Sequence, residues 1–178
     1  MSTLKVNKIE SKGSGGDAQH LELSTNGSTQ MYITSADEPD TTTATTLTNS
    51  ALSAAITPSS TSSKIFVNAS VTAGSNSDEN NVPGFGLRRD STDIGLSTTA
   101  SGNRKNVITG PGQTSNAFLG NCTMSHLDSP NTTSEVIYYM TFLARSGYTT
   151  QINKTGSDSD NAYVYRGSST ITLMEISG

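Results

Sequence analysis

Apolar residues in this chain recur in short runs that alternate with polar residues, the pattern of β-strands with one face against a core. Turn-forming residues separate these runs at short intervals, as in sandwiches and barrels. No window holds apolar residues at sustained helical spacing, so the sequence predicts an all-β protein. The predicted strands are Leu52–Thr57, Lys64–Thr72, Gly84–Arg89, Thr92–Ser97, Lys105–Thr109, Asn116–His126, Glu135–Ala144, Thr149–Lys154, Ala162–Arg166 and Ser169–Ile176.

Two long apolar runs, Val136–Leu143 and Ile171–Ile176, predict the central strands. In the second run, Ile171 and Leu173 share one face, and Met174 and Ile176 share the other. Because both faces carry apolar side chains, we expect this strand to be buried inside the sandwich or between subunits. The residues expected to pack in the core or at an interface between subunits are Ile137, Tyr139, Phe142, Ile171, Leu173, Met174 and Ile176.

The first part of the chain predicts a β-hairpin arm. Alternating segments flank Asn26-Gly27, a strong signal for a two-residue hairpin turn. Each segment has only one or two large apolar side chains, and such a hairpin needs further strands or another copy for stability. We therefore divide the chain into an arm (residues 1–34), a Thr-rich linker or edge strand (35–50) and an antiparallel sandwich (51–178).

Composition favours a structural protein that associates with itself. Ser and Thr make up about three residues in ten, while charged residues are 15% and hydrophobic residues 31%. The net charge of −4 is low for a disordered chain, so ordered β-structure is the better interpretation. Lys and Arg are scattered, and we expect no nucleic-acid binding. We also expect no membrane insertion and no secretory signal, hence synthesis in a cytoplasm.

Candidate catalytic chemistry is sparse. Cys122 lies in a strand-like run, where a thiol behaves as a small buried hydrophobe. His20 and His126 lack a spacing partner for a metal, and the acidic loops near Asp78 and Asp158 lack the features of an EF-hand. The acids lie mostly in turns, which disfavours a glycosidase with paired carboxylates. We expect no catalytic residue, metal or cofactor, with a carbohydrate-active enzyme as the minor alternative.

The aromatic residues and cations provide the candidates for ligand contact. The pairs Tyr138/Tyr139 and Tyr163/Tyr165 fall in predicted strands and are expected to pack. Tyr148 is expected in a loop and is the better exposed candidate for stacking on a sugar. The candidate contact residues are Tyr148, Arg145, Arg104 and Lys105.

Five segments stand out for their sequences and for their order along the chain: Met1–Ile9, Ile56–Val67, Gly84–Thr92, His126–Pro130 and Ser169–Ile176. Together they resemble segments of fibre and other virion proteins of marine tailed bacteriophages. The resemblance covers the N-terminal arm and much of residues 50–178, and it rests on the order in which the segments follow one another. It implies a particle-bound N-terminal arm and a C-terminal trimeric jelly roll similar to complement and tumour-necrosis-factor heads.

The resemblance implies a virion structural protein without enzymatic activity, a short homotrimeric tail or head fibre. Leu4, Val6 and Ile9 would attach it to other virion proteins, and the candidate contact residues would meet a host-surface glycan or protein. Deletion of residues 1–34 is then expected to leave the sandwich folded and to abolish attachment. A capsid decoration protein that stabilises the shell is the alternative.

Overall fold

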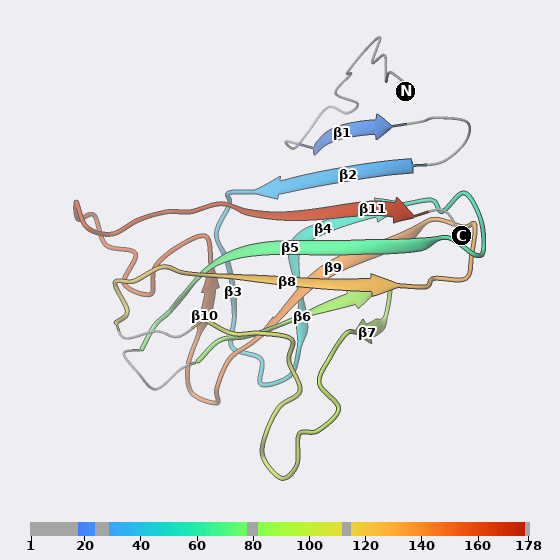
Figure 1. Cartoon of the computed structure of the whole chain (residues 1–178). Coiled ribbons are helices and arrows are strands. Elements are labelled where there is room, and N and C mark those ends of the chain that lie inside the picture. Colours follow the sequence, from blue (N-terminus) through green and yellow to red (C-terminus); the bar gives the residue numbers. More distant parts are fainter. Residues whose placement is uncertain (1–17, 24–28, 78–81, 112–114, 177–178) are drawn as a thin grey trace.

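The computed structural model describes residues 18–23, 29–77, 82–111 and 115–176, and these residues form two antiparallel β-sheets with no helix (Figure 1). The all-β, two-sheet architecture predicted from the alternation is confirmed. The larger sheet contains β1 (Ala18–Leu23), β2 (Thr29–Ala36), β3 (Asp40–Thr42), β5 (Lys64–Ser75), β8 (Gly120–Asp128), β10 (Thr150–Ile152) and β11 (Ser169–Ile176). The smaller sheet contains β4 (Thr48–Ile56), β6 (Gly84–Arg89), β7 (Thr92–Ile94) and β9 (Val136–Leu143).

Eight of these strands are paired in a nested order. Strand β2 pairs with β11, β4 with β9, β5 with β8, and β6 with β7. Along the chain, the first of the eight therefore pairs with the last, the second with the seventh, and so on inward. Successive pairs belong to alternate sheets, as they would in a long two-stranded ribbon rolled into a sandwich. Strands β1, β3 and β10 extend the larger sheet.

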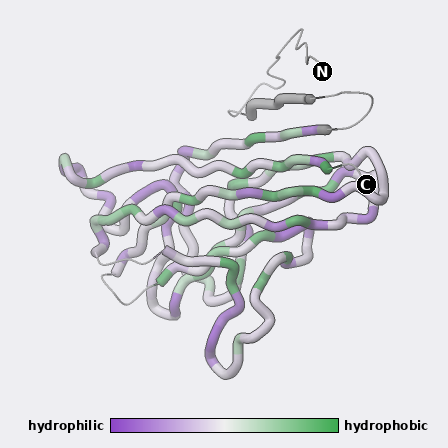
Figure 2. Tube along the Cα trace, in the orientation of Figure 1, coloured by the Kyte–Doolittle hydropathy of each residue, from purple (hydrophilic) through white to green (hydrophobic). Residues whose placement is uncertain are grey.

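The core lies between the two sheets, and the alternation along β5 shows how it is built. Every second residue from Ile65 to Ala73 is fully buried, whereas the residues between them are partly exposed. Phe85, Met140 and Phe142 fill the facing side of the core from the smaller sheet. Figure 2 shows the corresponding alternation of apolar and polar positions along the strands. One chain alone thus encloses a closed apolar core.

Within one chain, strand β11 is buried inside the sandwich on one face only, and burial of its other face between subunits stays a prediction. Ile171 and Leu173 face the core and are fully buried, but Ile176 is 44% exposed and Met174 is only half-buried. The physical reason is that the smaller sheet covers one face only, so the alternate side chains point outward. Among the residues expected in the core or at an interface, Phe142 is also buried, while Ile137 and Tyr139 are half-buried.

Two predicted strands are absent from the described structure. Residues 105–109 form a loop that contacts β6 through an isolated bridge between Phe85 and Thr109. Residues 162–166 belong to the β10–β11 connection, where one bridge joins Lys154 to Arg166. In both places the residues lack a long neighbouring strand with which to pair, so they form loops instead.

The N-terminal strands join the larger sheet directly. Strands β1 and β2 form an antiparallel pair, and β2 also pairs with β11 over six residues, from Ser169↔Ala36 to Met174↔Met31. Within residues 35–50, β3 forms an edge strand and β4 begins at Thr48. The predicted Asn26-Gly27 turn and the candidate attachment residues Leu4, Val6 and Ile9 lie outside the described residues.

Candidate functional site

Two of the candidate contact residues, Lys105 and Arg145, line one cavity of about 710 Å³. Lys105 belongs to the long β7–β8 connection, and Arg145 lies two residues after the end of β9. Residues separated by forty positions thus meet at one end of the smaller sheet. The volume is within the range of small-molecule sites.

The floor of this cavity is apolar and depends on a glycine. A Cβ atom on Gly84 would lie 2.8 Å from a methyl group of Val107 and 3.1 Å from one of Leu143. The absence of a side chain therefore allows the β7–β8 connection to pack against β6. Backbone hydrogen bonds from Phe85 N to Thr109 O (2.8 Å) and from Ile108 N to Phe85 O (2.8 Å) hold it there.

The other two contact candidates lie near the cavity but outside its lining. The guanidinium carbon of Arg145 is 5.4 Å from the ring centroid of Tyr148, a cation–π contact across a tight turn. Arg104 bonds within its own turn, where Nη1 donates to the Ser101 hydroxyl (3.1 Å). The structure therefore brings Lys105, Arg145 and Tyr148 together and leaves Arg104 on the outside of the loop.

The chemistry of the cavity suits an anionic ligand with an apolar body. Lys105 and Arg145 supply positive charge, Val107 and Leu143 supply apolar surface, and no carboxylate occurs among the described lining residues. Uronic or other acidic sugars combine these two properties. The sequence suggested the cations but gave no indication of the glycine-dependent floor.

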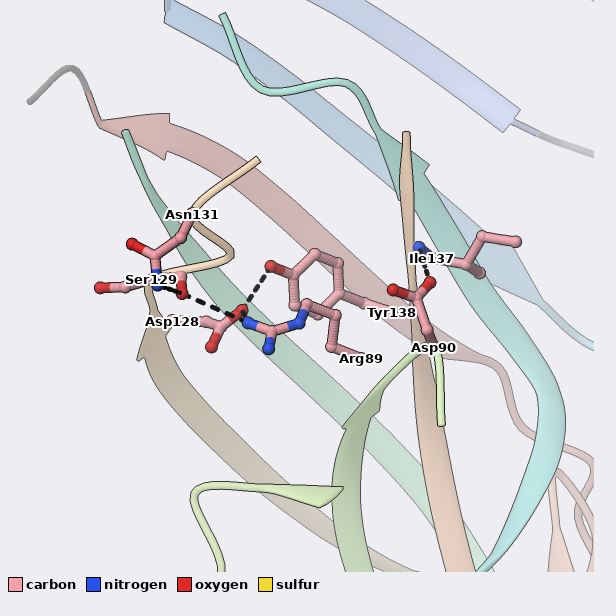
Figure 3. A network of polar contacts seen from close by, with 7 residues as sticks. All are labelled: Arg89, Asp90, Asp128, Ser129, Asn131, Ile137 and Tyr138. Atoms are coloured by element: carbon pink, nitrogen blue, oxygen red, sulfur yellow. Dashed lines mark hydrogen bonds and ion pairs between the residues drawn. The ribbon is translucent and has the colours of Figure 1, made fainter. Parts of the chain in front are cut away.

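A polar network joins the two sheets at the other end of β6 and contains a buried carboxylate (Figure 3). Asp128 Oδ2 on β8 accepts hydrogen bonds from Tyr138 Oη on β9 (2.7 Å) and from Arg89 Nη1 on β6 (2.6 Å). The next residue, Asp90, caps β9 by accepting from Ile137 N (2.9 Å). Asp128 thus links one strand of the larger sheet to two strands of the smaller sheet.

The network stabilises the fold and is poorly suited to proton transfer. Burial and the hydrogen bond to Asp128 raise the pKa of Tyr138 far above its ordinary value of 10.0. The phenol is therefore a permanent donor, and the ion pair with Arg89 compensates the charge of Asp128. The expected packing of Tyr138 is confirmed, since its side chain is fully buried.

The side chains of Cys122 and His126 also pack, whereas that of His20 lies outside the described part of the structure. Cys122 lies against the core, as predicted, and burial raises the pKa of its thiol from 9.0 to about 11. The ring of His126 lies against Gly95, where an added Cβ would approach within 3.0 Å. Among the described residues, no group of three His, Cys, Asp or Glu side chains could hold a metal ion.

The expectation that Tyr163 and Tyr165 pack is wrong. Each is 61% exposed, whereas Tyr148 is only partly exposed. The predicted strand that would have covered them is a loop, so their rings project from the β10–β11 connection. Together with Phe118, which is 57% exposed, they line a second pocket of about 370 Å³. Phe118 was not singled out in the sequence because it falls inside the predicted strand Asn116–His126, whereas the observed strand β8 begins only at Gly120.

The outer face of the larger sheet carries two parallel rows of aligned side chains. Strands β2, β11, β5 and β8 pair in a register that places large apolar residues in one row and hydroxyl residues in another, four positions further along each strand. Leu127 is 46% exposed, so the apolar row is accessible in a single chain. The apolar row is Met31, Met174, Phe66 and Leu127, and the hydroxyl row is Ser35, Thr170, Ser70 and Thr123.

Comparison with known proteins provides no identification. No protein-family model matches the chain, and no curated protein sequence matches it significantly. The described part of the chain contains no helix long and apolar enough to cross a membrane.

Proposed function

We propose that this chain is a virion structural protein, a short homotrimeric tail or head fibre that attaches through its N-terminal arm and contacts the host surface with its sandwich. It acts by binding and assembly rather than by catalysis. The nested pairing of eight strands in two sheets carries the proposal, because two sheets of this kind are typical of jelly rolls, which include viral capsid and lectin domains.

The apolar row supports assembly. Its side chains occupy four adjacent strands of the outer face, where Leu127 and the neighbouring Ile176 are 46% and 44% exposed. Isolated exposed apolar residues are common, but an aligned set on a sheet marks an interaction surface. On one side of the row lie the uncharged residues Thr172, Asn68 and Ser125, and on its other side the exposed Lys64 pairs with Ile176. An interface between copies would therefore be largely uncharged, with Lys64 at its margin.

The cavity between Lys105 and Arg145 supports contact with a host surface. Many bacterial surface glycans are acidic, and the two cations with the apolar floor complement such a ligand. Each single contact would be weak. A trimer would present three copies of the cavity, so multivalent binding would supply the avidity that one site lacks.

The assembly is tested by measuring mass in solution. Sedimentation equilibrium should give three times the 18.6 kDa of one chain for the wild type. Leu127→Glu places a charge in the apolar row and should shift the equilibrium to monomers, because an unpaired charge would be buried at the interface. Thr123→Glu, on the same strand and face but in the hydroxyl row, is the matched control and should remain trimeric.

A wild-type chain that stays monomeric at micromolar concentration would refute the trimer. The location is tested separately, by cryo-electron microscopy of the intact particle. Density for three sandwiches projecting from the tail or head supports a fibre. Density lying flat on the shell at a symmetry axis would instead identify a capsid decoration protein, and absence from the particle would refute the virion assignment.

A further inference from the structure

We propose that the pocket formed by Phe118, Tyr163 and Tyr165 binds a neutral oligosaccharide, and that it is a second ligand site distinct from the Lys105–Arg145 cavity. The two sites share no described lining residue. Three large rings that are 57–61% exposed around one hollow of about 370 Å³ form an aromatic platform, not scattered surface residues. The proposal stands on these rings alone and does not depend on the virion assignment or on trimer formation.

The rings belong to two segments that are tied together. Phe118 lies just before β8, and both tyrosines lie in the β10–β11 connection. Ser157 N donates to Asn116 O (3.0 Å), which joins the two segments at the backbone. Residues that are far apart in the chain therefore form one pocket wall.

The β10–β11 connection is also braced internally. Arg166 makes a two-pronged ion pair with Asp158, with Nε–Oδ1 and Nη2–Oδ2 distances of 2.7 and 2.9 Å. Asn161 Nδ2 donates to the hydroxyl oxygen of Tyr163 (3.0 Å), and Val164 N donates to Asn161 O (3.0 Å). A platform that is already ordered loses less conformational freedom when a ligand binds.

The chemistry of the pocket favours a neutral sugar. Aromatic faces pack against the C–H faces of a pyranose, while phenol hydroxyls and amides at the rim can bond to its hydroxyls. The charges of the β10–β11 connection balance, since Asp158 pairs with Arg166 and lies 3.8 Å from Lys154, and the exposed Asp160 is a second carboxylate beside these two cations. Little uncompensated charge remains to attract a phosphate or carboxylate, in contrast to the Lys105–Arg145 cavity.

The test uses the full chain and three defined probes, cellohexaose, maltohexaose and mannohexaose. Saturation-transfer NMR should detect contact with at least one probe, and calorimetry should give its Kd. Tyr163→Ala and Tyr165→Ala should each weaken binding about tenfold, because each removes one stacking surface. Tyr148→Ala removes a tyrosine at the other cavity and should leave the Kd unchanged.

Because both tyrosines are mostly exposed, the variants should keep the wild-type melting temperature, which separates lost binding from lost folding. Failure of all three probes to bind at millimolar concentration would overturn the proposal. So would binding that both tyrosine variants retain, or binding that disappears only in Lys105→Gln and Arg145→Gln. A loss of self-association in Tyr163→Ala would also overturn it, since the pocket would then be a contact between copies.

Discussion

At the scale of single residues, the structure depends on a few buried polar side chains that organise irregular segments. Asn153 is fully buried and has a positive φ of 62°, a conformation that asparagine tolerates better than most residues. Its side-chain nitrogen donates to Ala36 O (2.8 Å) and Glu38 O (3.1 Å), and its side-chain oxygen accepts from Ser169 Oγ (2.7 Å). One residue thereby ties the β10–β11 connection to the end of β2.

We expect Asn153→Ala to lower the free energy of unfolding by about 3 kcal/mol, because it leaves buried hydrogen-bonding groups without partners and strains the backbone. Urea denaturation measures the change. Asn131→Ala is the control, since Asn131 also has a positive φ (54°) but is exposed and donates only to Ser129 O. Equal losses in the two variants would show that backbone conformation, rather than the buried amide, is responsible.

The alkaline stability of the protein should depend on Cys122. Its pKa is raised from 9.0 to about 11 by burial, so the folded state holds the thiol proton more tightly than the unfolded state does. The resulting stability is fully present below pH 9 and is lost as the pH rises toward about 11. Urea midpoints across this range should fall less steeply in Cys122→Ala than in the wild type.

The raised pKa of Tyr138 acts in the same direction above pH 10. A decline should therefore remain in Cys122→Ala at the highest pH, and Tyr138→Phe should reduce it while also weakening the contact with Asp128. Parallel pH profiles for Cys122→Ala and the wild type would contradict the assigned role of the thiol.

At the scale of elements, the position of β2 in the larger sheet limits how much of the N-terminal segment can be deleted without disrupting the sandwich. The strand pairs with β11, and Tyr32 packs against the core beside Leu173. A cut after residue 34 would therefore remove most of a strand that belongs to the larger sheet. The arm hypothesis is better tested by a cut after residue 17, which retains β1 and β2 but deletes Leu4, Val6 and Ile9.

We expect deletion of residues 1–17 to leave the melting temperature unchanged and to abolish incorporation into particles. Deletion of residues 1–34 should lower the free energy of unfolding by about 3 kcal/mol or more, because it exposes the edge of β11 and removes packed side chains. Calorimetry and particle purification provide the two measurements. Normal incorporation of the shorter deletion would mean that attachment resides elsewhere.

At the scale of the whole molecule, the proposed trimer would strengthen the proposed binding of acidic glycans, because it presents several Lys105–Arg145 cavities at once. We expect the wild type to bind a surface coated with alginate, an acidic polysaccharide, about 100-fold more tightly than the Leu127→Glu monomer does, because several cavities engage at once. Biolayer interferometry measures this ratio. A soluble alginate hexamer occupies one cavity and should bind both proteins equally, and Lys105→Gln with Arg145→Gln should abolish both signals.

Some of this architecture was predictable from local pattern. The alternation along Lys64–Thr72 identified β5 because one buried face leaves a period of two in the sequence. Gly84–Arg89 was also identified as a strand, although the first four residues of β6 are all buried. The same rule failed for residues 162–166, where alternation without a paired neighbour gave a loop with exposed tyrosines. Periodicity reports which residues could share a face, but not whether a second layer covers that face.

The sequence by itself determined the secondary-structure class and most strand positions, because strand periodicity and turn chemistry are local properties. Tertiary structure decided the pairing of strands, and with it every candidate site. Met31 and Leu127 belong to one row only because β2, β11, β5 and β8 lie in that order. Phe118 and Tyr163 likewise share a pocket through contacts between distant segments, which no local pattern encodes.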